Sequence, residues 1–185
     1  MNSPLDNKYT QINATNAKGP LREASNIINR AFRLKNTYAK LITLNSDIFI
    51  VKENIPKPKK AYGCYILTRE RPRVLNISTA ALKPEIQNTK TGYEVIHFTW
   101  YKILDFAKKN KYKTLTLDVD AKNKNLLKLY KKFGFKIVDK YYCIWDLKSY
   151  YKMARSVDET KEMYYPAKRK ILKTARLYLR KWLKI

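Results

Sequence analysis

Residues 117–135 read LDVDAKNKNLLKLYKKFGF, and this stretch decides the fold. Leu117 and Val119 alternate with aspartates, which is the period of a strand with one buried face. Residues 123–133 then place apolar side chains at helical spacing, and Gly134 follows as a residue on which helices commonly end. A strand that passes directly into a helix, followed by a further apolar run, predicts a mixed α/β structure.

The chain before this stretch continues the same alternation of strands and helices. Residues 92–110 predict a long helix, because one face gathers Val95, Ile103 and Phe106. Residues 73–82 predict a strand that Pro84 stops. Further upstream, the sequence predicts a first strand, a helix and a two-stranded hairpin, at residues 8–14, 21–34, 47–52 and 61–68.

The chain after this stretch divides into a short hairpin and a basic extension. Residues 135–138 and 141–147 predict the hairpin, with Asp139 and Lys140 as its turn. We therefore expect an α/β domain over residues 1–148, with a mixed, mostly antiparallel sheet of about six to seven strands flanked by helices. Residues 149–185 predict a basic helical extension whose last twenty residues are amphipathic, with Tyr178 and Trp182 on the apolar side.

Composition excludes several classes of protein. The apolar fraction of 45% supports a packed core, and no apolar run is long enough to span a bilayer. The first residues lack the pattern of a signal peptide. The only cysteines, Cys64 and Cys143, lie in strand-like runs, and His97 is the only histidine. These features predict a cytoplasmic protein without a disulfide scaffold or a zinc site, and helical spacing places His97 on the surface.

The charge balance points to an anionic partner. Forty lysines and arginines face only 15 acidic residues, which gives a formal net charge of +25. A lysine-rich codon bias would raise glutamate as well, so the imbalance favours binding to nucleic acid, an acidic protein or an anionic membrane. Three alternatives stay open for the C-terminal extension: it packs against the domain, it lies on an anionic membrane, or it binds a phosphate backbone. A homodimer is also left open.

Residues 117–135 resemble the GNAT superfamily of N-acetyltransferases. The family pattern has a strand ending LEV, then an asparagine, then a helix closing LYxxxGF; Asn123, Tyr130 and Gly134 match it. Upstream, residues 82–92 (LKPEIQNTKTG) resemble the family's fourth-strand exit and its R/Q-x-x-G-x-G/A pyrophosphate loop. Gln87 and Gly92 match that loop, whereas Lys90 stands where its first glycine would be. The resemblance covers about four fifths of the chain and implies the GNAT fold and acetyl-CoA as cofactor.

The resemblance also implies roles for individual residues. The loop would bind the cofactor's pyrophosphate at a helix N-terminus, where backbone amides and the helix dipole favour anions. Leu82 would offer backbone groups to the thioester and pantetheine, and Asn123 would bind the pantetheine or cap its helix. The implied cofactor-binding set is Leu82, Gln87, Asn88, Thr89, Lys90, Thr91, Gly92, Tyr93 and Asn123. A left-handed Lys90 would cost about 1–2 kcal/mol, which its ammonium could offset at a phosphate.

Catalysis needs a proton donor for the leaving thiolate and a base for the amine. By resemblance Tyr130 is the donor, since a phenol is protonated at neutral pH; a core tyrosine is the alternative. Glu85, Asp118 and Asp120 are the candidate bases, acting through water, although Asp118 also matches a position with a structural role in the family.

These residues predict an acetyl-CoA-dependent N-acetyltransferase. Its acceptor would be a primary amine on an acidic or nucleic-acid-linked molecule, such as aminoacyl-tRNA or a protein, because a cationic polyamine would be repelled. Two alternatives remain from the sequence: a catalytically degenerate nucleic-acid-binding module of the same fold, and a membrane-surface acyltransferase.

Overall fold

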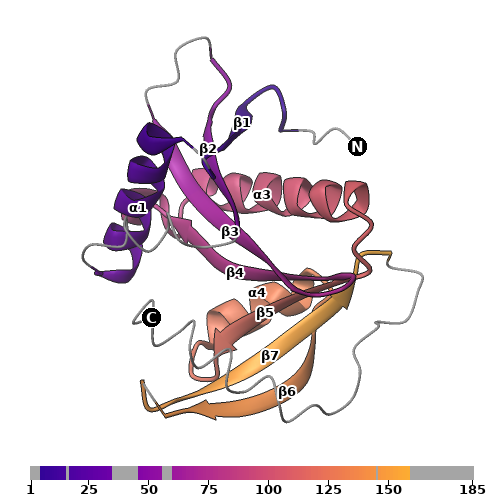
Figure 1. The fold of residues 1–185 in the computed structure, drawn as a ribbon. Coiled ribbons are helices and arrows are strands. Elements are labelled where there is room, and N and C mark those ends of the chain that lie inside the picture. Colours follow the sequence, from indigo (N-terminus) through magenta and orange to yellow (C-terminus); the bar gives the residue numbers. More distant parts are fainter. Residues whose placement is uncertain (1–4, 16, 35–45, 56–59, 145, 159–185) are drawn as a thin grey trace. The chain divides into compact units, whose positions relative to one another are not determined.

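The structure, a computed structural model, describes residues 5–15, 17–34, 46–55, 60–144 and 146–158. Its seven strands form one mostly antiparallel sheet in the order β1-β2-β3-β4-β5-β7-β6 (Figure 1), as expected for the α/β fold. The described chain divides into two compact parts. We call residues up to 69 together with 77–110 the N-terminal part, and residues 70–76 together with those from 111 onward the C-terminal part.

The N-terminal part contains two long helices, strands β1 and β2, and β3 and β4 except for their residues 70–76, which belong to the C-terminal part. Their bounds are β1 Tyr9–Asn13, α1 Lys18–Phe32, β2 Asp47–Glu53, β3 Ala61–Arg71, β4 Val74–Leu82, the single 3₁₀ turn η1 Pro84–Ile86, and α3 Lys90–Lys109. Strand β2 pairs antiparallel with both β1 and β3, which confirms the expected hairpin. Helix α1 begins at Lys18, ahead of the expected start at residue 21, because Pro20 falls in its first turn, where a missing N–H is tolerated.

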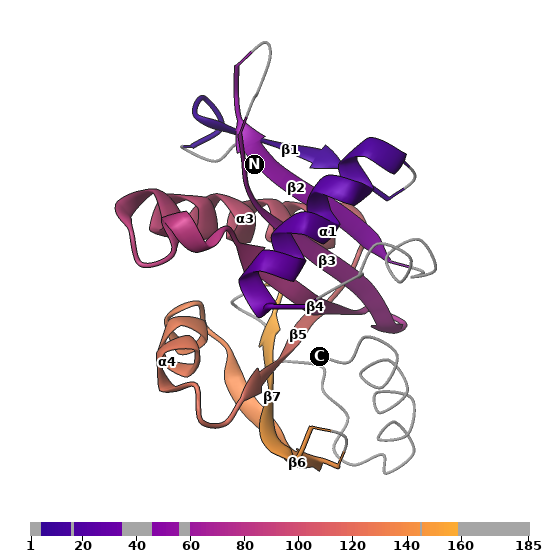
Figure 2. The ribbon, with the colours of Figure 1, turned by 90° about the vertical axis from the view of Figure 1, so that its left-hand side faces the viewer.

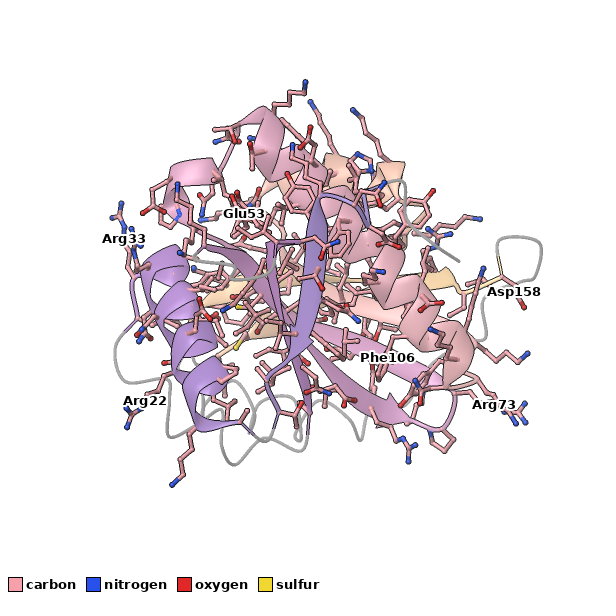
Figure 3. The ribbon with its side chains drawn as sticks, turned by 90° about the horizontal axis from the view of Figure 1, so that it is seen from above. Arg22, Arg33, Glu53, Arg73, Phe106 and Asp158 are labelled. Atoms are coloured by element: carbon pink, nitrogen blue, oxygen red, sulfur yellow. The ribbon has the colours of Figure 1, made fainter. Side chains whose placement is uncertain are left out.

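Helices α1 and α3 cover opposite faces of these strands (Figures 2 and 3). On one face, Ile48 and Ile50 of β2 join Ile27 of α1 in a buried apolar cluster. On the other face, Phe49 packs edge-on against Phe106 of α3, with ring centroids 5.6 Å apart. Successive residues of a strand point to opposite faces, so residues 48–51 of β2 are all apolar because both faces of the strand are covered there.

The C-terminal part contains three strands and one helix. These are β5 Thr114–Asp120, α4 Lys124–Lys132, β6 Lys136–Cys143 and β7 Lys148–Ser156. Strand β7 lies between β5 and β6 and pairs antiparallel with both (Figure 1). The predicted hairpin over residues 135–147 is therefore wrong in detail. Asp139 and Lys140 lie inside β6, next to a register shift, and the turn comes after Cys143.

Strand β7 also lies within the stretch for which the sequence predicted a helical extension. The rest of that stretch, residues 159–185, lies outside the described residues, so the amphipathic helix and the division into two domains stay predictions. In the described part of the chain, no helix combines the length and the apolar character needed to cross a membrane.

A buried polar cluster joins the strands of the C-terminal part. Lys152 of β7 is fully buried and donates to both carboxylate oxygens of Glu70, each 2.5 Å away. Thr116 of β5 donates to the same carboxylate at 2.7 Å and accepts from Asn76 at 3.0 Å. Asp118 stands opposite Lys152 in the β5–β7 register. A buried ammonium is tolerated here because a carboxylate and hydrogen bonds surround it.

Candidate functional site

The loop between β4 and α3 folds around the carbonyl of Ile86. That oxygen accepts hydrogen bonds from the Thr89 amide at 3.2 Å and from the Thr89 hydroxyl at 2.7 Å. The same hydroxyl accepts from the Gly92 amide at 3.1 Å, so Thr89 is the N-cap of α3. A threonine just before a helix is a common cap, so the sequence carried this signal.

Gly92 is required by the tight path of this loop. A Cβ placed on residue 92 would lie 2.1 Å from the Ile86 carbonyl oxygen, which is a backbone atom and cannot move aside without the loop. The close approach explains why a glycine stands here, two residues into the helix, where glycine otherwise costs helix stability. Gly92 therefore fixes the position of the first amides of α3.

Several backbone amides of this loop have no partner in the part of the chain that the structure describes. Among the described residues, no acceptor is recorded for the amides of Asn88, Lys90 and Thr91, all at the N-terminus of α3. Lys90 and Asn88 are exposed, as is Tyr93 one turn further on. Unpaired amides, the positive end of a 20-residue helix and an exposed ammonium together form a site that favours an anion.

The left-handed residue of this loop is Asn88, with φ of 61°, and Lys90 is not among the residues with positive φ. The strain considered for a left-handed Lys90 therefore does not arise, because Lys90 begins the helix with ordinary backbone geometry. Asparagine tolerates the left-handed region better than most residues with a side chain. The departure from the glycine pattern thus places a cation in the loop without this backbone cost.

Leu82 and Gln87 are joined across the base of the loop. The Gln87 side-chain amide donates to the Leu82 carbonyl at 3.1 Å. The side chain of Gln87 therefore closes the loop. The Leu82 carbonyl keeps a second lone pair for another donor. The sequence grouped both residues as cofactor contacts, and the structure brings them together as the two ends of one turn.

Asn123 and Tyr130 lie on α4 in the C-terminal part. The Asn123 side-chain oxygen accepts from the Leu126 amide at 3.1 Å, so Asn123 is the N-cap of this helix. Tyr130 packs edge-on against Phe135, with ring centroids 5.8 Å apart. Burial raises the pKa of the Tyr130 phenol above its ordinary value of 10.0, which keeps it protonated at neutral pH.

Arg155 of β7 fixes the end of α4, a contact that the sequence did not predict. Its guanidinium donates to the carbonyl of Phe133 at 2.5 Å, at the C-cap of the helix. Gly134 then takes φ of 81° and turns the chain, so that Phe135 is buried. A cation at a helix C-terminus is favourable, and here it holds the helix that carries Tyr130.

The candidate bases occupy different surroundings. Glu85 is half exposed and pairs with Arg30 of α1; a backbone hydrogen bond and then that guanidinium hold its pKa below the usual range. Asp120 pairs with Lys148 at 3.8 Å and accepts from the Lys122 amide at 2.8 Å. Asp118 faces the buried cluster around Lys152. Glu85 belongs to the N-terminal part, whereas the two aspartates of β5 belong to the C-terminal part.

A cavity of about 410 Å³ lies in the N-terminal part, beside the end of β4. Among the described residues, its lining consists of Glu23, Asn26, Ile27, Asn29 and Arg30 of α1, together with Lys83. The Asn29 side-chain oxygen is buried and has no hydrogen-bond partner in the described structure. The sequence does not predict this cavity, because its residues follow helical spacing on α1 and meet Lys83 only in the fold.

The pattern that defines the "Acetyltransferase (GNAT) family" matches residues 23–135 of the sequence. Comparison with curated proteins gives no match. Among solved structures, a GNAT family acetyltransferase from Elizabethkingia anophelis with acetyl-CoA bound is 19% identical, with a TM-score of 0.64 over 82% of this chain and 99% of that one.

Two further solved structures are of enzymes that are named for different acceptors. The ribosomal-protein-S18-alanine N-acetyltransferase from Escherichia coli is 20% identical, with a TM-score of 0.63 over 85% of this chain and 100% of that chain. A spermidine/spermine N-acetyltransferase from Vibrio cholerae is 18% identical, with a TM-score of 0.63 over 82% and 94%. At these identities the likeness concerns the fold, which agrees with the family match.

Proposed function

The chain belongs to the acetyltransferase (GNAT) family, and on this premise we propose that it transfers an acetyl group from acetyl-CoA to a primary amine of an acidic or nucleic-acid-linked acceptor. The observation that carries the proposal is the loop at the start of α3. There, Gly92 lets the chain fold tightly onto Ile86, and the amides of Asn88, Lys90 and Thr91 have no partner among the described residues.

The loop suits the pyrophosphate of acetyl-CoA. Three amides at a helix N-terminus supply hydrogen-bond donors, and the Lys90 ammonium adds a positive charge next to them. Acetyl-CoA, when bound, supplies a thioester that an amine can attack. Solved structures of the same fold contain acetyl-CoA or CoA, in keeping with this assignment.

We assign Tyr130 as the residue that donates a proton to the leaving thiolate. Burial raises the pKa of this phenol, so it is protonated at neutral pH and has a proton to donate to the sulfur when the thioester carbon–sulfur bond breaks. Asn123 and Leu82 then serve the pantetheine arm, as the family resemblance implies. Both use one lone pair inside the protein and keep a second for the ligand.

We place the acceptor amine in the cavity beside α1. The buried Asn29 oxygen can accept a hydrogen bond from an amine, while Arg30 and Lys83 favour an acceptor that carries negative charge. Glu85, which pairs with the cavity residue Arg30, stays ionised at neutral pH and can take the amine proton through water. We assign Asp118 a structural role in the β5–β7 pair.

Acetyl transfer to defined acceptors tests the proposal. Mass spectrometry would follow the acetylation of charged tRNA, an acidic protein and spermidine, at equal concentrations, by the full chain and by Tyr130→Phe. We expect transfer to one of the anionic acceptors and little to spermidine. Loss of the phenolic proton should lower kcat by about 100-fold or more, with the Kd for acetyl-CoA nearly unchanged.

The pH profile checks the role of Tyr130 independently. The donor must be protonated, and its folded pKa lies above 10.0, so the activity that depends on it should persist from neutral pH to at least about pH 9. The assignment would be contradicted if activity fell with rising pH already below about pH 9, and if this fall were absent in Tyr130→Phe. Binding of acetyl-CoA without transfer to any amine would favour the alternative, a catalytically degenerate binding module.

A further inference from the structure

The outer face of α4 carries four lysines in a row, which we call the α4 lysine stripe. Its members are Lys124, Lys128, Lys131 and Lys132, and all four are exposed. At about 100° per residue they fall within a stripe about 100° wide, on the side opposite Leu126, Tyr130 and Phe133. The helix from Lys124 to Lys132 contains no acidic residue.

This arrangement of charges destabilises the helix that carries it. Lys124 and Lys128, like Lys128 and Lys132, are like charges four residues apart, and each such pair costs about 0.2–0.5 kcal/mol. Lys124 also stands in the first turn, where the helix dipole disfavours a cation. An ordinary solvent-exposed helix mixes acids and bases on this face, so an uncompensated row of lysines points to an anionic ligand.

Several lysines elsewhere in the described chain have acidic partners. Lys102 pairs with Asp6 at 2.7 Å, Lys109 with Asp105 at 2.8 Å, and Lys52 with Glu23 at 2.6 Å. None of the four stripe lysines takes part in an ion pair with another described residue. Within the part of the chain that the structure describes, the stripe therefore keeps its charge unpaired.

We propose that the α4 lysine stripe docks the phosphodiester backbone of a nucleic acid. From Lys124 to Lys132 the helix rises about 12 Å, a length over which one nucleic-acid strand carries three or four phosphates. Lysine is a compact point charge, suited to contacts with phosphates that carry no sequence information. This inference rests on the proposed function, because it identifies the anionic carrier of the acceptor amine as nucleic acid.

The chemistry of the stripe favours nucleic acid over the other polyanions. A membrane-binding amphipathic helix carries its lysines on one face and inserts the apolar residues of the other face among the lipids. In α4 the residues opposite the stripe face the protein, where Tyr130 packs edge-on against Phe135. A regular row of cations also matches evenly spaced phosphates better than the irregular carboxylates of an acidic protein surface.

Fluorescence anisotropy with a labelled RNA hairpin tests the inference. The full chain is titrated at several KCl concentrations, and the variant Lys124→Gln, Lys128→Gln, Lys131→Gln, Lys132→Gln is compared with it. A matched control replaces four other exposed lysines without recorded ion pairs, Lys18, Lys60, Lys108 and Lys113, with glutamine. Both variants lose the same charge, so only the position of the charge differs. Double-stranded DNA of equal length shows which nucleic acid is preferred.

We expect the stripe variant to bind the nucleic acid at least about tenfold more weakly than the wild type. The slope of the logarithm of its binding constant against the logarithm of the KCl concentration should fall in magnitude by about 3. The affinity of the control variant should change by less than about threefold. Equal losses in both variants would overturn the proposal, since net charge alone would then explain binding. So would wild-type protein that binds neither RNA nor DNA, or that binds anionic vesicles or polyglutamate through the same four lysines.

Calorimetric titration of acetyl-CoA into the same proteins separates the two proposals. The stripe variant is expected to keep its acetyl-CoA affinity and its helical circular dichroism, because its substitutions remove like-charge pairs from α4. Wild-type protein that binds acetyl-CoA but no nucleic acid would end the inference and leave the donor site in place. Nucleic-acid binding through the stripe without acetyl-CoA binding would end the proposed function instead.

Discussion

At the scale of single residues, Gly92 determines whether the proposed donor loop can form. Replacing it with alanine would place a methyl group 2.1 Å from the Ile86 carbonyl oxygen, so the loop must open or shift. We expect Gly92→Ala to lower the free energy of unfolding by about 1–3 kcal/mol and to weaken acetyl-CoA binding at least about tenfold. Urea unfolding and calorimetric titration measure the two effects.

Gly19→Ala is the matched control for this substitution. Gly19 also lies in the first turn of a helix, α1, but a Cβ there would meet no atom within 4 Å. Alanine at that position should leave acetyl-CoA binding unchanged and stability unchanged or slightly higher. Equal effects of the two substitutions would show that the close approach at Ile86 does not matter for the loop.

The sequence predicted the members of the loop but not what each one does. The family pattern selected Gln87 and Gly92, and both are central to the geometry. It also raised the question of strain at Lys90, whereas the left-handed residue is Asn88. The backbone conformation of a loop depends on contacts such as those of Thr89 with Ile86, which a residue pattern does not encode. The roles of Tyr130 and Glu85 stay predictions for the assays above.

At the scale of secondary-structure elements, periodicity predicted every strand and helix except those at the C-terminal end. Strands such as β2 and β5 gave clear apolar patterns. Strand β7 did not, because it lies between β5 and β6 and buries residues on both faces, Lys152 and Arg155 among them. Read as sequence, SYYKMARS is basic and lacks alternation. Its burial depends on Glu70, which is distant in the sequence.

The Lys152–Glu70 pair gives a prediction at this scale. Removing the ammonium in Lys152→Met leaves Glu70 buried without its main partner, with Asp118 opposite the new methionine. We expect the free energy of unfolding to fall by about 3–5 kcal/mol. The double variant with Glu70→Gln should recover part of this loss, because no unpaired charge is then left at that position. Urea unfolding of the two singles and the double gives the coupling energy.

A simple sum of the two single effects would contradict this account of the cluster. Additive losses would mean that the two side chains stabilise the protein separately, for example by packing alone, and not as a charge pair. The same conclusion would follow if the free energy of unfolding of the double variant fell by as much as in the two single variants together.

At the scale of the whole molecule, the sequence established the family and the fold class, because residues 117–135 carry a specific pattern and the element order agrees with it. The cytoplasmic location and a homodimer stay predictions. The net charge of +25 predicted an anionic partner, but its distribution became visible only on the surface of α4. Composition reports the total charge, and only the fold shows which lysines have acidic neighbours.

The acceptor could not be predicted at any finer level from the sequence. Proteins of the same fold are named for acceptors as different as a ribosomal protein and spermidine. A shared fold therefore positions the donor chemistry and leaves the acceptor to local side chains. In our proposal those are the residues of the cavity beside α1, which no motif marks.

Isothermal titration of acetyl-CoA into the full chain tests the central claim most directly. We predict a single site with a Kd in the micromolar range, about −8 kcal/mol of binding free energy, that is weakened in Gly92→Ala and retained in Tyr130→Phe. Absence of binding heat and of thermal stabilisation at millimolar acetyl-CoA would contradict the claim that this loop is a working donor site.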